Sequence, residues 1–139
     1  MGTLLYYVRA VDPTMLTSLG SITAKQANST EQTMQILKQL LDYAASHPDD
    51  IIAYKASEMV LAGHRDASYL SKTKACRRAG VHLFISSSTA FPPNNGSVFI
   101  ISKIINTFMS SAVDAELGSL FLNCKEVIPS HQALEEMGH

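Results

Sequence analysis

The strongest constraint on the fold is a change of hydrophobic period near the middle of the chain. In the segment AGVHLFIS, residues 79–86, apolar residues stand at every second position, namely Val81, Leu83 and Ile85. A period of two predicts a strand with one buried face. Near both ends of the chain the apolar residues recur instead at steps of three and four, the period of a helix. The sequence therefore predicts an α+β protein.

This change of period divides the chain into a helical segment over residues 1–50 and a sheet-containing domain over residues 51–139. In the first part, Asp12 followed by Pro13 predicts the start of one helix. Ser29, with a glutamine three residues later, predicts the start of a second helix. The apolar face expected for this second helix consists of Met34, Leu37, Leu41 and Ala44.

The second part predicts a three-stranded antiparallel meander. Its strands are expected at residues 57–64, 79–86 and 97–105, with a shorter strand-like run at 51–54. The loop SSTAFPPNNG, which precedes the third strand, is dense in turn-forming residues. The third run, SVFIISKII, is apolar enough to be buried on both faces.

A long helix is expected after the meander. Ser111 and Asp114 have the spacing of a capping box at its start. Pro129 predicts a kink or a break further along. We expect Cys124 to be a small buried hydrophobe. The apolar stripe expected for this helix consists of Val113, Leu117, Leu120, Cys124, Val127 and Leu134.

Composition narrows the class of protein. Hydrophobic residues make up 46% of the chain and charged residues 17%, which indicates a folded globular protein. A net charge of -1 excludes a strongly basic nucleic-acid-binding body, although a local basic patch stays open. The apolar runs are shorter than the roughly 20 residues of a membrane span, and no signal-peptide pattern is present. Two cysteines without metal-site spacing favour an intracellular, reduced protein.

Two carboxylates form the candidate site. Asp66 comes just after the expected strand 57–64, and Glu116 lies in the second turn of the long helix. A helix packed across a sheet can bring such a glutamate over a strand end, where two carboxylates repel unless a proton or a cation bridges them. Oxygen ligands alone favour Mg²⁺ or Mn²⁺. The spacing by itself equally fits the commoner situation, in which both acids are solvated or cap a helix.

The two carboxylates belong to a series of four motifs that follow one another along the chain: GHRDASYL, RRAGVHLFIS, VFIISKII and MSSAVDAELGSLFLN. Asp66 lies in the first motif and Glu116 in the last. Together the four motifs resemble the RNase H region of copia-type retrotransposon polyproteins, and the upstream helical segment resembles the one that joins reverse transcriptase to RNase H there. The resemblance implies an incomplete RNase H-like fold, a three-stranded antiparallel meander plus a long helix, preceded by two N-terminal helices. It also implies an ancestral Mg²⁺-dependent nuclease, a hydrolase that cleaves the RNA of RNA–DNA hybrids.

The resemblance assigns roles to single residues. Asp66 matches the first catalytic aspartate and Glu116 the helix glutamate, both of them metal ligands, whereas Asp114 matches a non-catalytic acid. The family's two further aspartates would lie beyond His139, so we expect weak catalysis or none from this chain alone. Arg65 departs from the family pattern, and its charge is expected to compete with a cation for Asp66.

Basic residues between the first two main strands are candidates for binding a phosphate backbone, with an ordinary solvated hairpin loop as the alternative. They are Lys72, Lys74, Arg77 and Arg78. A non-enzymatic interaction protein or nucleic-acid-binding protein that kept the scaffold is therefore the second function. We interpret His64, His82 and His131 as surface or packing residues.

The implied fold also leaves one edge of the first strand unpaired. Such edges pair readily with another chain. We therefore expect self-association through this edge or through the N-terminal helices. A third possibility is that a longer chain supplies the remaining aspartates.

Overall fold

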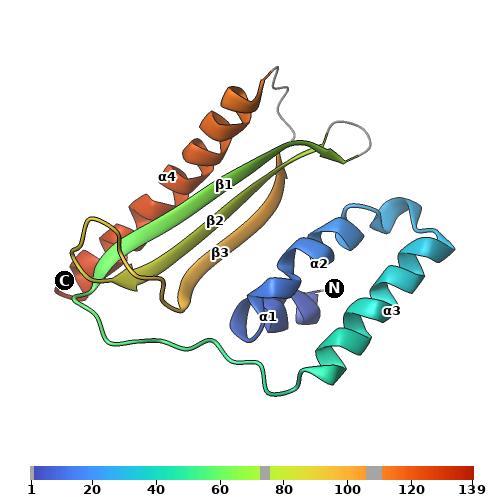
Figure 1. Cartoon of the computed structure of the whole chain (residues 1–139), viewed down its shortest axis with the longest axis horizontal. Coiled ribbons are helices and arrows are strands. Elements are labelled where there is room, and N and C mark those ends of the chain that lie inside the picture. The colour runs from blue at the N-terminus through green and yellow to red at the C-terminus, as the bar shows by residue number, and fades with distance from the viewer. Residues whose placement is uncertain (1, 73–75, 106–110) are drawn as a thin grey trace. The chain divides into compact units, whose positions relative to one another are not determined.

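The computed structural model describes residues 2–72, 76–105 and 111–139 (Figure 1). The chain forms two compact units, Met1–Ile52 and Ala53–His139. The first contains helices, and the second contains an open three-stranded antiparallel sheet and a long helix. This mixture of helix and sheet confirms the predicted α+β class. None of the helices in the described ranges is long and apolar enough to cross a membrane.

The first unit contains one more α-helix than the two expected. Its elements are α1 (Gly2–Ala10), η1 (Pro13–Met15), α2 (Leu16–Thr23), η2 (Gln26–Asn28) and α3 (Glu31–Ser46). Asp12 caps η1 as predicted, since its carboxylate accepts a hydrogen bond from the Thr14 backbone N–H at 3.0 Å. The extra helix, α1, forms around Val8, which is completely buried. No capping residue in the sequence predicts this helix, and burial of Val8 is what stabilises it.

Helix α3 begins one residue later than expected and turns a different face inward. Thr30, rather than Ser29, is the N-cap and forms a capping box with Thr33. Leu40 is buried, whereas Met34 and Leu41 of the predicted apolar face are 59% and 48% exposed. The helix carries two overlapping apolar stripes, and packing against α2 selects the one that contains Leu40.

The sheet of the second unit is the predicted meander. Its strands are β1 (Val60–Lys72), β2 (Cys76–Ser86) and β3 (Ser97–Ile105), each antiparallel to the next. The expectation that the first strand ends before Asp66 is wrong. The ladder continues through Asp66, which lies opposite Gly80, and through Ala67, which lies opposite Ala79. Asp66 is therefore a mid-strand residue.

The strand-like run at 51–54 is not a strand. The segment before β1 is held instead by Asn95, whose Oδ1 accepts a hydrogen bond from the Lys55 N–H at 2.7 Å. The Asn95 Nδ2 donates to the carbonyl oxygens of Lys55 at 2.9 Å and Ile85 at 2.7 Å. Gly96 is required beside it, because a Cβ there would lie 2.7 Å from the Tyr54 ring. Side-chain bonds thus replace strand pairing in this segment.

Helix α4 (Ala112–Glu136) packs along β1 and β2 (Figure 1). Its start has the predicted capping box of Ser111 and Asp114. It runs through Pro129 as one helix, so of the two outcomes predicted there, a kink or a break, the break does not occur. The expectation that β3 is buried on both faces is also wrong, since β3 is an edge strand with Val98 54% exposed.

Leu134 of the predicted stripe is buried, but the face that α4 turns to the sheet is otherwise a different one. Ala115 and Ser119 are buried at 1% and 0% exposure, whereas Val113 and Leu117 are 67% and 59% exposed. Cys124 is exposed as well, which corrects the expectation that it is buried. Small residues let the helix approach the sheet closely, and the larger apolar side chains are left on the outside.

Candidate functional site

Asp66 lies in the middle of β1 with its side chain exposed. Its Oδ1 accepts a hydrogen bond from the backbone N–H of Ala67 at 2.8 Å. The carbonyl oxygen of Asp66 accepts a bond from the Ser119 hydroxyl at 3.0 Å, which ties β1 to α4. That carbonyl lies on the side of Gly80 in β2, and the N–H of the same peptide group points the opposite way. The Asp66 carboxylate therefore binds the Ala67 N–H, which is a hydrogen-bond donor on the free edge of β1.

Glu116 is held by Arg65. The Arg65 Nη1 lies 2.7 Å from the Glu116 Oε2 and also donates to the Glu116 carbonyl oxygen at 3.1 Å. The two side chains are 34% and 47% exposed, so the pair lies at the surface. The competition was expected at Asp66, but the ion pair that Arg65 forms is with Glu116.

Strand alternation separates the two candidate carboxylates. Arg65 reaches Glu116 on α4, so it lies on the sheet face that α4 covers. Its neighbour Asp66 then directs its side chain to the opposite face. Within the described parts of the chain, no three His, Cys, Asp or Glu side chains form a group that can hold a metal ion. Asp66 and Glu116 therefore do not converge on one point.

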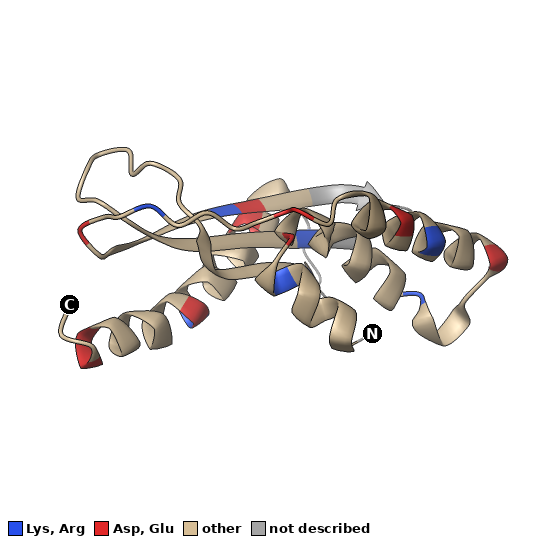
Figure 2. Cartoon of the chain, turned by 90° about the horizontal axis from the view of Figure 1, so that it is seen from below, with Lys and Arg blue, Asp and Glu red and all other residues tan. Residues whose placement is uncertain are grey.

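The predicted basic cluster lies partly outside the described structure. Lys74 is not among the described residues, and the same holds for the side chains of Lys72 and Arg77. The Arg78 guanidinium donates to the Ser102 hydroxyl of β3 at 2.9 Å. Among the described residues, Lys and Arg positions are spread over separate helices and strands rather than gathered (Figure 2).

A ring cluster on β1 and β2 was not recognised as a unit in the sequence. His64 lies directly opposite His82, and the two ring centroids are 6.4 Å apart. Both rings contact the Phe84 ring, at 5.1 Å from His64 and 4.9 Å from His82. Burial lowers the pKa of His82 from its ordinary value, and the nearby His64 lowers it further. The sequence did not reveal the pair because alternation within each strand does not give the register between strands, and it is the register that places His64 beside His82.

The outer face of α4 carries a continuous apolar stripe. Each exposed member lies three or four residues from another member, so they share one side of the helix. We call this set the α4 stripe: Val113, Leu117, Leu120, Phe121, Cys124 and Ile128. Contiguous exposed apolar surface of this kind marks interaction sites more often than isolated apolar residues do.

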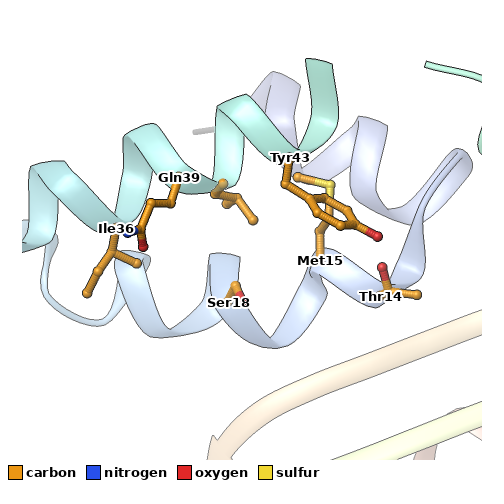
Figure 3. A pocket seen from close by; sticks show the side chains of 7 residues that line it. Thr14, Met15, Ser18, Ile36, Gln39 and Tyr43 are labelled. Atoms are coloured by element: carbon orange, nitrogen blue, oxygen red, sulfur yellow. The ribbon is translucent and has the colours of Figure 1, made fainter. Parts of the chain in front are cut away.

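The first unit has a groove of its own, between η1–α2 and α3 (Figure 3). It encloses about 400 Å³. Its walls are formed by Thr14, Met15, Ser18, Ile36, Gln39, Leu40 and Tyr43. The Tyr43 ring extends across Met15 toward Thr14, and no charged side chain lines the groove (Figure 3). Its lining suits packing between the helices more than recognition of a charged ligand.

Comparison of the chain with models of protein families, with curated proteins and with solved structures gives no significant match in any of the three.

Proposed function

We propose that this chain is a retroelement-derived, RNase H-like module that works as a non-enzymatic interaction protein inside the cell, with a second copy of itself as partner. The observation that carries this proposal is the α4 stripe, in which Val113, Leu117 and Phe121 are 67%, 59% and 69% exposed. The RNase H-like part rests on the sequence motifs and on the order of the elements, a three-stranded meander followed by a long helix. Neither observation requires catalysis.

The placement of the acids favours a binding role over hydrolysis. Cleavage by two metal ions needs several carboxylates fixed around ions about 3.5–4 Å apart. Here Glu116 is paired with Arg65, and Asp66 points to the other face of the sheet. If Mg²⁺ or Mn²⁺ binds, these two residues remain its candidate ligands, one at a time and weakly.

A cleavage assay tests this part of the proposal. RNA–DNA hybrid is incubated with Mg²⁺ or Mn²⁺ and the wild-type chain, Asp66→Asn or Glu116→Gln. We expect no cleavage above background from any of the three. Cleavage by the wild type that disappears in both variants would show a working nuclease and contradict the proposal.

The same hybrid tests the nucleic-acid-binding alternative. That alternative predicts binding without cleavage, lost when Lys72, Lys74, Arg77 and Arg78 are changed to glutamine. It also predicts that affinity falls steeply as salt concentration rises. Binding with these properties would assign the scaffold to nucleic acid instead of to a second copy.

The α4 stripe is self-complementary. Two copies of α4 that pack antiparallel about a two-fold axis bring each stripe residue opposite another stripe residue. The matched pairs are Leu120 with Phe121, Leu117 with Cys124, and Val113 with Ile128 of the second copy. This self-matching selects a second copy over an unrelated partner.

The free edge of β1 is the less suitable surface for pairing. Asp66 already occupies the outward N–H of Ala67, which an added strand would need. The α4 stripe spans about 22 Å between Val113 and Ile128. A stable interface covers about 800 Å² on each partner, so association through the stripe alone is expected at micromolar rather than nanomolar concentration.

A cross-linking experiment tests the antiparallel pairing. With Cys76→Ser as background, Leu117→Cys is expected to form a covalent dimer under mild oxidation, through Cys124 of the second copy. The two positions are about 10.5 Å apart along one helix, beyond the roughly 7 Å limit for a disulfide, so they cannot pair within one chain. Val113→Cys, on the same stripe but opposite Ile128, is the matched control.

Light scattering provides the independent measurement. Leu117→Gln should weaken association, whereas Met34→Gln should not, although both side chains are 59% exposed. A monomer at high concentration would contradict the proposal. So would equal effects of the two substitutions, or covalent dimers formed equally well by Val113→Cys.

A further inference from the structure

The sheet face opposite α4 carries two histidines that lie directly opposite each other on neighbouring strands. Arg65 contacts α4, and a Cβ at Gly63 would lie 3.6 Å from Asn123 of the same helix, so these residues face α4. His64 lies between them in the sequence and therefore faces the other way. His82 is its direct partner on β2, and directly opposed residues in an antiparallel pair lie on the same face. The two imidazoles thus project side by side from one surface.

Phe84 orients both rings. It is fully buried, and its ring stacks with His82 at a centroid distance of 4.9 Å and an angle of 26°. The His64 ring lies 5.1 Å from Phe84 at 32°. Both imidazoles contact the Phe84 ring, and their own planes differ by 30°. This support limits the rotation of the rings before any ligand arrives.

The spacing of the rings matches a bridging metal ion. Imidazole nitrogens bind such ions at about 2.0–2.1 Å, and each nitrogen lies about 1.2 Å from its ring centre. Because the nitrogen lone pair lies in the plane of the ring, both nitrogens can reach one ion only where the ring centres lie within about 6.5 Å of each other. The observed separation of His64 and His82 is 6.4 Å. The pair is therefore within reach of one shared ion, and a separation near this limit corresponds to nitrogens on opposite sides of the ion, an arrangement that square-planar Cu²⁺ and Ni²⁺ accept.

We propose that His64 and His82 chelate a late first-row transition-metal ion, Cu²⁺ in preference to Ni²⁺ or Zn²⁺, with water completing the coordination. Imidazole suits these ions, and Cu²⁺ binds most tightly at a given nitrogen site. The His64 side chain is exposed and His82 is half-buried, so an ion reaches the pair from solvent. Asp66 follows on the same face, but its Oδ1 is bonded to the Ala67 N–H. Among the described side chains, no third ligand is grouped with the two imidazoles.

The test is a Cu²⁺ titration of the full chain with both cysteines changed to serine, so that the exposed Cys124 thiol neither binds nor reduces the ion. Native mass spectrometry measures stoichiometry, and electron paramagnetic resonance counts the coordinated nitrogens. We expect one ion per chain with a signal from two imidazole nitrogens. His64→Asn and His82→Asn should each weaken binding at least tenfold and remove the two-nitrogen signal.

His131→Asn is the matched control, because His131 lies 3.5 Å from Glu135 in an i, i+4 pair that offers an ordinary competing site. It should leave binding unchanged. Loss of the ion in His131→Asn, or its retention in His64→Asn, would overturn the proposal. The exposed His64 keeps the test decisive if His82→Asn fails to fold, since unfolding is detected separately by circular dichroism.

Discussion

At the scale of single residues, the most informative side chain is His82, although the sequence pointed to the acids Asp66 and Glu116 as the candidate site. His82 lies on the central strand β2, at a position where alternation predicts a polar surface residue, yet it stacks on buried Phe84 and lies opposite His64. Burial disfavours the charged imidazolium, and the neighbouring imidazole adds to this effect. The pKa of His82 is therefore lower in the folded chain than in the unfolded chain.

This difference predicts a loss of stability in mild acid. As pH falls through the ordinary histidine pKa of about 6.5, the unfolded chain takes up the proton and the folded chain does not. Protonation therefore favours unfolding, and the free energy of unfolding should fall between pH 7 and pH 5. Urea denaturation at several pH values measures it. His82→Gln should flatten this dependence and His131→Gln should not. An unchanged slope in His82→Gln would contradict the assignment.

The pair formed by Arg65 and Glu116 leads to a second residue-scale prediction. Both side chains are at least a third exposed, and ion pairs of this kind contribute about 0.2–1 kcal/mol. Arg65→Gln should lower the free energy of unfolding by no more than about 1 kcal/mol. Glu135→Gln, in the pair with His131 at 3.5 Å and more than 60% exposure, should have an even smaller effect. A loss above about 2 kcal/mol in Arg65→Gln would show that the pair is more than a surface contact.

At the scale of elements, close packing of α4 on β1 and β2 depends on small residues from both sides. Ala115 and Ser119 supply them from the helix, and Gly63 supplies one from the sheet. A Cβ at Gly63 would lie 2.7 Å from the Leu83 Cδ2 atom, and Leu83 is fully buried. Such a contact forces a core side chain to move.

Gly63→Ala should therefore destabilise the chain by about 1–3 kcal/mol, through overpacking beneath α4. The matched control is Gly80→Ala on the neighbouring strand, where a Cβ meets only the Asp66 carbonyl oxygen at 3.9 Å. Thermal or urea unfolding compares the two. If both substitutions have the same effect, the cause is the general cost or gain of replacing glycine in a strand.

Two helices show why packing faces were predicted less well than the helices themselves. In α3 and in α4, apolar residues stand at helical spacing on two adjacent stripes, and propensity does not distinguish them. Packing against the neighbouring element determines which of the two stripes is buried. In α4 the sheet accepts Ala115 and Ser119, and Ser119 gains a hydrogen bond to the Asp66 carbonyl oxygen that a larger apolar residue cannot make.

At the scale of the whole molecule, low charge and an exposed apolar stripe act together. The net charge is -1 and the sequence pI is near 6.5, so electrostatic repulsion between copies is weak near neutral pH. Light scattering of the full chain should therefore rise to a maximum near pH 6.5. The double substitution Leu117→Glu with Phe121→Lys leaves the net charge unchanged and should reduce this maximum strongly. An unaltered maximum would assign association to net charge rather than to the α4 stripe.

The sequence by itself determined the α+β class, the antiparallel meander and the caps at Asp12 and Ser111. These features depend on period and on contacts within a few residues, which are local in the chain. It also singled out Asp66 as an acid at the end of an expected strand and Glu116 as an acid in the second turn of the long helix. Their chemistry as metal ligands stays a prediction that the proposed assay addresses.

Only the tertiary structure decided which surfaces these elements present. It placed Asp66 in mid-strand, paired Glu116 with Arg65, set His64 opposite His82 and left the α4 stripe uncovered. Each of these outcomes depends on strand register or on the rotation of a helix about its axis. Both are fixed by contacts between residues far apart in the sequence, because only those contacts distinguish equally spaced stripes and equally alternating faces.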